Sequence, residues 1–257
     1  MGNGIAFLAG SLLKTGPSVL TQEVDFGIEG FWQINFFGQK VWLTTSHVSM
    51  LIILVLLIGF AIVANIVIRK ANPNQVPGKF LNFIELIVET LDKMTLSSMG
   101  TKHGHKFQNY IGTLFIFILF SNLSGLIGLR SATADYGTTL GLALITFVMI
   151  HYNGFKYQKL GHITNLFKPI LLAPINIIGE LATPLSLSLR LFGNVLSGTV
   201  MLALIYGLLP KLLLVFISPV LAGAHVYFDI FSGAIQTYVF CMLTMTFVSQ
   251  NFDEEEA

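Results

Sequence analysis

Charged side chains are scarce in this sequence. Asp, Glu, Lys and Arg make up 11% of its 257 residues, and the formal net charge is +1. Soluble domains carry about 25% charged residues, so this composition argues against a soluble globular protein. The chain also lacks a run of basic residues, and we therefore expect no nucleic-acid partner.

Cysteine and catalytic motifs are equally rare. The single cysteine, Cys241, excludes an internal disulfide and has no CxxC partner for a zinc site. His103 and His105 form an HxH pair, but the polar segment around them offers no further ligands. The chain has no GxxxxGK[ST] nucleotide loop, no GxSxG and no HExxH sequence. We therefore expect no metal, no cofactor and no catalysis by the chain itself.

Long apolar runs dominate what is present. Hydrophobic residues make up 54% of the chain, and several windows reach the ~20 apolar residues that a spanning helix needs. These runs are continuous and lack the alternation of barrel strands. The sequence predicts an all-α polytopic membrane protein, with one membrane domain over 46–257. We place its five spans at 48–68, 109–130, 137–152, 174–208 and 212–250.

The last two predicted spans are too long to cross a membrane upright. Each runs for about 35 residues, which at ~1.5 Å per residue gives roughly 50 Å, against a hydrocarbon core of ~30 Å. Such helices must tilt strongly, bend or protrude.

Two further segments are predicted to avoid the membrane interior. In 79–97, apolar residues recur at helical spacing and charged residues fall between them, which predicts an amphipathic helix on the membrane surface or on a partner. Residues 1–45 mix acidic side chains with aromatic ones, including Trp32 and Trp42. Because tryptophan favours the headgroup region, we predict an extracytoplasmic, interfacial N-terminal segment.

Basic residues set the expected orientation. Most Lys and Arg residues lie in the loops 69–109 and 153–172. The positive-inside rule assigns these loops to the cytoplasm. With five spans, the N-terminus is then expected outside and the C-terminus in the cytoplasm.

Three charged residues lie within the apolar sequence of the last two spans: Glu180, Arg190 and Asp229. A charge at mid-bilayer costs about 3 kcal/mol on insertion scales, so such residues are functional candidates by default. Arg190 has long apolar runs on both sides and is hard to explain by snorkelling to the headgroups. The structural alternative is an Arg190–Asp229 ion pair.

Polar residues in these two spans recur at helical spacing. Arg190, Asn194 and Ser197 are spaced i, i+4, i+7 and therefore share one face of a helix. The last span carries a second polar stripe, with spacing i, i+4, i+7, i+11, made of His225, Asp229, Ser232 and Gln236. If the two polar faces are turned toward each other, they form a hydrophilic track through an apolar protein.

The arginine stretch resembles a known family. "PLSLSLRLFGNVLSG" (184–198), followed by "AIQTYVFCMLT" (234–244), is similar to subunit a of bacterial F-type ATP synthases. "GKFLNFIELIVE" (78–89) and "SNLSGLIG" (121–128) resemble two further family stretches, in the same order. The resemblance implies a multi-pass protein of the bacterial plasma membrane whose two long tilted helices curve around a ring of c subunits.

The resemblance also implies roles for residues. Arg190 matches the essential arginine that separates two offset ion half-channels. Thr199 and Asp229 occupy positions that carry a carboxylate and a histidine in some relatives, which puts a scheme with two carboxylates in doubt. The predicted half-channel residues are Asn194, Asp229, Gln236, His225, Tyr227, Thr199, Ser197, Glu180 and Ser186, with Glu180 and Ser186 assigned to the inner half-channel.

The implied partners are the c-ring, a dimer of subunit b in the peripheral stalk, the soluble ATPase indirectly, and lipid. The coupling ion, proton or sodium, stays open, because its ligands would lie mainly in the ring. The alternative function is a stand-alone ion channel or transporter in which Arg190 binds an anion.

Overall fold

A computed structural model describes residues 30–36, 39–71, 78–127, 129–159, 161, 164, 167, 172–208 and 211–252. Within them, five helical stretches are long and apolar enough to span a membrane. This confirms the predicted membrane architecture of spanning helices. The principal helices are α2 (Thr45–Lys70), α3 (Lys79–Leu123), α4 (Tyr136–Gln158), α6 (Ala173–Leu208), α7 (Lys211–His225) and α8 (Gly233–Ser249).

A short β-hairpin precedes α2 and was not predicted. Strand β1 (Gly30–Phe36) pairs antiparallel with β2 (Gln39–Thr44). The sequence of β1 alternates, with Trp32, Ile34 and Phe36 separated by polar residues, which is the period-two signal of a strand. Residues 1–29 of the predicted interfacial segment lie outside the described residues, and its extracytoplasmic location stays a prediction.

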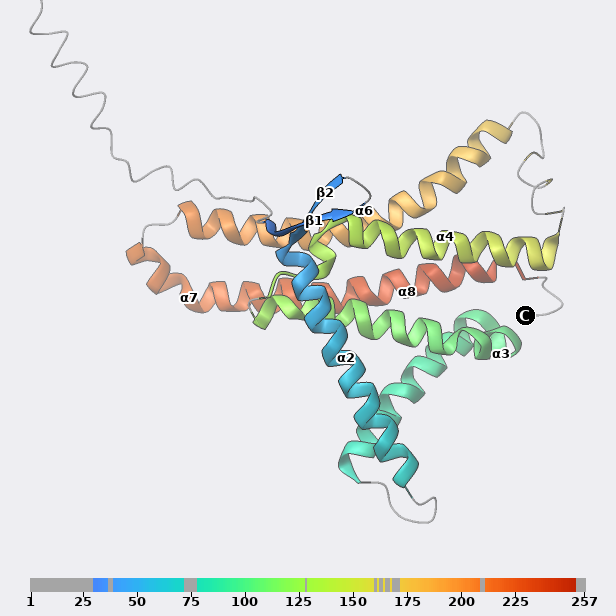
Figure 1. Ribbon diagram of the computed structural model, residues 1–257, viewed down its shortest axis with the longest axis horizontal. Helices are drawn as coiled ribbons and strands as arrows, with labels where there is room; N and C mark the ends of the chain where they lie inside the picture. Colours follow the sequence, from blue (N-terminus) through green and yellow to red (C-terminus); the bar gives the residue numbers. More distant parts are fainter. Residues whose placement is uncertain are drawn as a thin grey trace, which may run out of the picture.

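Helix α3 changes direction at Gly100. This residue has φ 74° and ψ 164°, a conformation that glycine adopts without steric cost. The first part of α3 contains the predicted amphipathic segment and lies beside α2, where the rings of Phe60 and Phe80 are 6.3 Å apart. The second part runs back along α8 (Figure 1). Gly100 therefore separates the amphipathic segment from the second predicted span, although the surface location of that segment stays a prediction.

The core lies between the second part of α3 and helices α4, α6 and α8. Ile118, Ala143, Leu191 and Met245 come one from each of these helices and have no exposed surface. Cys241 is also fully buried, as a free thiol. Two short 3₁₀ helices, η1 (Ser124–Ile127) and η2 (Ala132–Ala134), connect α3 to α4.

The last third of the chain forms two long helical runs that lie antiparallel in Figure 1. Helix α6 is continuous over 36 residues. The second run begins as α7, passes through a π-helical segment, η3 (Val226–Ser232), and continues as α8. A π-helix closes i→i+5 hydrogen bonds and is often found at functional sites. The π segment was not predicted and contains Asp229.

Candidate functional site

Arg190 lies on the outer face of α6. Its neighbours Leu187 and Leu191 are 2% and 0% exposed and pack in the core, whereas Arg190 itself is exposed. Arg190 forms no ion pair with any residue that the structure describes, so the Arg190–Asp229 pair considered from the sequence is not formed. The guanidinium is thus available to a group outside the chain.

An open pocket of about 220 Å³ begins at Arg190 and extends toward the start of α6. Its polar groups come from Thr183, Ser186 and Arg190, which are spaced i, i+3, i+7 on one face of the helix. The Thr183 hydroxyl donates to the carbonyl of Gly179 in its own helix. The full lining is Gly179, Ala182, Thr183, Ser186, Leu187, Arg190, Leu243 and Phe247.

The two predicted polar stripes meet on the other side of Arg190. The Ser232 hydroxyl donates to Asn194 Oδ1 at 2.9 Å, which joins η3 to α6. One turn farther along, a Cβ placed on Gly198 would lie 3.4 Å from the side chain of Phe228. These two contacts define an antiparallel register, because a step of four residues forward on α6, from Asn194 to Gly198, corresponds to a step of four residues back on the other helix, from Ser232 to Phe228. The next step along this register places Gln236 level with Arg190.

Gln236 is buried, with 7% of its surface exposed. Its Nε2 has no hydrogen-bond partner among the described residues. An unsatisfied buried donor costs about 1–3 kcal/mol, so this amide is a candidate to bind water or an incoming polar group.

Asp229 lies against the connection that follows α3. A Cβ on Gly125 of η1 would be 3.4 Å from Asp229 Oδ1. The carboxylate is half-buried. The Asp229 side chain of the π segment therefore lies against η1, whereas the side chain of Ser232, three residues later, contacts α6.

Three other predicted half-channel residues, Ser197, Thr199 and Tyr227, do not join this contact. The exposed hydroxyls of Ser197 and Thr199 donate to the carbonyls of Asn194 and Leu196 in their own helix, both at 2.9 Å. Tyr227 is 54% exposed, and its ring stacks with Phe231 at 5.5 Å. His225 ends α7, and its side chain lies outside the described residues.

A buried network beside η3 was missed by sequence reasoning. Asn122 Nδ2 donates to the carbonyl of Gly233 at 3.1 Å and to Thr237 Oγ1 at 3.3 Å. Asn122 Oδ1 accepts from Thr133 Oγ1 at 2.6 Å, and Thr133 in turn contacts Ser131. The network fixes the junction of η3 and α8 to the end of α3. The concentration of Ser, Thr and Asn in 121–133 was the available signal.

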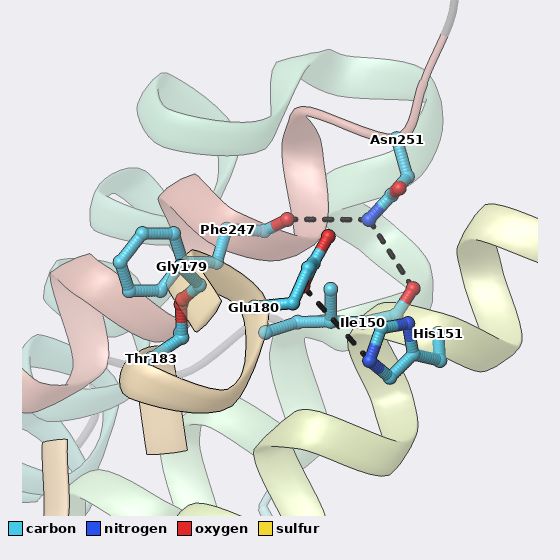
Figure 2. Close-up of polar contacts among 7 residues, drawn as sticks. All are labelled: Ile150, His151, Gly179, Glu180, Thr183, Phe247 and Asn251. Atoms are coloured by element: carbon cyan, nitrogen blue, oxygen red, sulfur yellow. Dashed lines mark hydrogen bonds and ion pairs between the residues drawn. The ribbon is translucent and has the colours of Figure 1, made fainter. Parts of the chain in front are cut away.

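A second missed contact lies near the start of α6. His151 Nε2 of α4 is 3.9 Å from Glu180 Oε2 (Figure 2). Asn251 lies close by, and its Nδ2 donates to the carbonyls of Ile150 and Phe247. Glu180 was predicted as an inner half-channel residue, but His151 was not singled out, because spacing along one helix carries no information about a neighbouring helix.

Comparison with known proteins decides the family. The family described as ATP synthase A chain matches residues 47–249, which include every helix of the site. The chain belongs to this family. It is 37% identical to ATP synthase subunit a of Desulforamulus reducens over 236 residues, which covers 86% of this chain and 87% of the relative.

Two further relatives support the same conclusion. One is the sodium ion specific ATP synthase subunit a of Propionigenium modestum, 36% identical over 203 residues, or 72% of this chain and 68% of the relative. The other is ATP synthase subunit a 1 of Syntrophotalea carbinolica, 35% identical over 237 residues, or 87% and 95%.

Membership in the family has two direct consequences for this subunit a homologue. The chain is a multi-pass membrane protein, in agreement with its apolar helices. It is also part of an ATP synthase complex that contains a c-ring and other subunits. The stand-alone transporter considered from the sequence is accordingly disfavoured.

Proposed function

We propose that the chain forms two offset half-channels that carry protons to and from the carboxylates of the c-ring, with Arg190 as the barrier between them. The observation that carries the proposal is the position of Arg190. It is a permanent charge on the outer face of a 36-residue apolar helix, without an ion-pair partner among the described residues. Because an unpaired charge in the membrane is costly, we expect an anionic group on a neighbouring subunit to pair with Arg190.

The expected partner is a c-ring carboxylate that passes Arg190 during rotation. A nearby positive charge favours the ionised form of a carboxyl group, so the proton is released on approach. The bare attraction for a pair 4 Å apart is about 4 kcal/mol at an effective dielectric of 20. Water in the pocket lowers this value further, which allows the carboxylate to leave. Arginine fits this role better than lysine because guanidinium keeps its charge when desolvated.

The polar groups on either side of Arg190 support the two half-channels. On one side lie Asn194, Ser232, Gln236 and Asp229, which we assign to the outer half-channel together with Tyr227, His225, Thr199 and Ser197. On the other side the pocket passes Ser186 and Thr183 toward Glu180, and we assign this path to the inner half-channel. The two paths open toward opposite ends of α6, as a barrier between offset half-channels requires.

We further propose that the outer faces of the two long helical runs meet the c-ring. A dimer of subunit b contacts the chain elsewhere, and the soluble ATPase is coupled to the chain through these subunits. We place the N-terminus outside a bacterial plasma membrane and the C-terminus in the cytoplasm. The choice of protons over sodium is tested by measuring the ATPase activity of the complex at different sodium concentrations. We expect the activity to be independent of the sodium concentration.

The decisive experiment replaces Arg190 with alanine in the assembled complex. We expect Arg190→Ala to abolish ATP-driven proton pumping, because the passing carboxylate no longer loses its proton. Leu189→Ala is the matched control, since Leu189 is the adjacent residue and is 54% exposed. Pumping at the wild-type rate by Arg190→Ala, at equal levels of assembled complex, would show that the barrier lies elsewhere.

A further inference from the structure

His151 and Glu180 bring an imidazole and a carboxylate together between two helices. His151 Nε2 and Glu180 Oε2 are 3.9 Å apart, within ion-pair distance and beyond a direct hydrogen bond. Their side chains are 26% and 31% exposed. The two groups are therefore partly shielded by protein and still reach solvent, so protons can exchange with water at this position.

The surroundings of the pair hold His151 in place. The ring of Phe147 packs edge-on against the His151 ring at 4.2 Å. The end of α8 is attached to α4 beside it, because Asn251 Nδ2 donates to the Ile150 carbonyl at 3.2 Å and to the Phe247 carbonyl at 3.3 Å.

Glu180 is the titratable residue that α6 presents to His151, and the α8 end contributes the non-titrating Phe247 and Asn251 (Figure 2). On α4 itself, Tyr152 and Lys156 follow His151 in sequence. Among the described residues, the carboxylate of Glu180 lies within ion-pair distance of the imidazole.

The pocket that begins at Arg190 leads toward this pair. Thr183 and Gly179 line its far end, and Glu180 occupies the same turn of α6. Phe247 lines the pocket as well and lies near Glu180 in Figure 2. A proton that leaves a carboxylate at Arg190 along this face therefore meets Glu180 and His151 next.

We propose that His151 is the proton-transfer residue at the mouth of the inner half-channel, where it exchanges protons with Glu180. This inference rests on the proposed function of the chain. A proton reaching the Glu180 carboxylate forms the neutral acid, which transfers it to Nε2 of the neutral imidazole, directly after a small side-chain rotation or through one water. The carboxylate is restored, and the imidazolium releases the proton to bulk water. Pumping driven by ATP uses the same steps in reverse.

Histidine suits this position because its charge changes between about pH 5 and 8, so it both accepts and releases protons near neutrality. Glutamine is close in size and cannot carry a proton. We expect His151→Gln to slow ATP-driven proton pumping about tenfold, less than the ~10²–10⁴-fold effect of positioned proton-transfer groups, because water offers a parallel path. We also expect passive proton conductance of the membrane sector to lose its dependence on pH over the imidazole range.

The test uses assembled complexes in membrane vesicles, normalised to the amount of complex. His105→Gln is the matched control, because His105 is an exposed histidine at the Gly100 turn of α3 that bonds only a neighbouring glutamine in the described structure. Glu180→Gln should reproduce the defect of His151→Gln. The double variant should be no slower than the slower single variant, since both residues act in one path.

Two results would overturn the inference. One is a wild-type pumping rate and pH profile in His151→Gln; the other is a double variant in which the two defects multiply. Arg190→Ala distinguishes this inference from the proposed function. If Arg190→Ala is inactive and His151→Gln is normal, the inference alone fails; if Arg190→Ala pumps, the proposed function fails.

Discussion

Asn122 offers the sharpest test of how the π segment is held. Its side chain makes three hydrogen bonds within a buried network, two to Gly233 and Thr237 of α8 and one to Thr133. Asn122→Ala removes all three. The partners keep other bonds, because Thr237 Oγ1 still donates to Gly233 and Thr133 still contacts Ser131. The variant therefore loses hydrogen bonds without leaving these partners unsatisfied.

The expected loss of stability in Asn122→Ala follows from the number of hydrogen bonds that are removed. Interhelical hydrogen bonds in membrane proteins average about 0.6 kcal/mol each, so three give a loss of roughly 2 kcal/mol. A soluble protein of this size loses about 2–4 °C in Tm per kcal/mol, which leads us to expect a Tm about 5 °C lower. Proton flux should also fall, because Asp229 and Gln236 flank the junction that Asn122 fixes.

The assay is thermal unfolding of the purified chain in mild detergent, with proton pumping measured on the assembled complex. Asn109→Ala is the control, since Asn109 lies on the same helix with an exposed side chain; its cost should stay within about 0.5 kcal/mol. The double variant with Thr133→Val should cost less than the sum of the two single variants. An Asn122→Ala variant as stable as Asn109→Ala would refute the network as an anchor.

Two further predictions concern the same junction. Gly233→Ala would place its Cβ 3.0 Å from Asn122 Cβ, and we expect this overpacking to cost about 1–3 kcal/mol in thermal unfolding. Gly141→Ala, where no atom lies within 4 Å of the new Cβ, should instead be neutral or stabilising, and equal behaviour of the two variants would contradict the packing. Asp229→Asn should slow proton uptake from the outer side while the complex still assembles, as measured by the pumping rate per assembled complex. Asp135→Asn is its control, because Asp135 caps α4 and asparagine caps a helix equally well; unchanged pumping in Asp229→Asn would remove this carboxylate from the path.

Features that depend on one helix could be predicted from the sequence. The apolar runs predicted the spanning helices, and the i, i+4, i+7 spacing placed Arg190 and Asn194 on one face of α6. Arg190 was recognisable because a charge far from either end of an apolar helix has few structural explanations. These inferences hold because the geometry of an α-helix is set by local hydrogen bonds.

Contacts between helices could not be predicted in this way. Asn122 and Gly233 are separated by 111 residues, and His151 and Glu180 come from different helices. Their meeting depends on the register of packed helices, which no periodicity within one helix encodes. The hairpin is a different case, since the alternation in β1 is a local pattern that the sequence itself contains.

The π segment explains why the second polar stripe divides. In a continuous α-helix, Asp229, Ser232 and Gln236 would lie on one face, as the sequence predicted. The wider π turn advances each side chain by a smaller angle, so Asp229 is rotated relative to the residues that follow η3. Ser232 accordingly bonds to Asn194 of α6, whereas Asp229 lies against Gly125 of η1. In the register set by the Asn194–Ser232 and Gly198–Phe228 contacts, Asp229 lies near the level of Gly198, about two helical turns from Arg190, so the carboxylate is not opposite the guanidinium. A carboxylate facing Arg190 within the chain would compete with the c-ring carboxylate that we propose pairs with this guanidinium. The position of Asp229 along the helix and its contact with η1 both avoid that competition, while Asp229 stays near the proposed outer path.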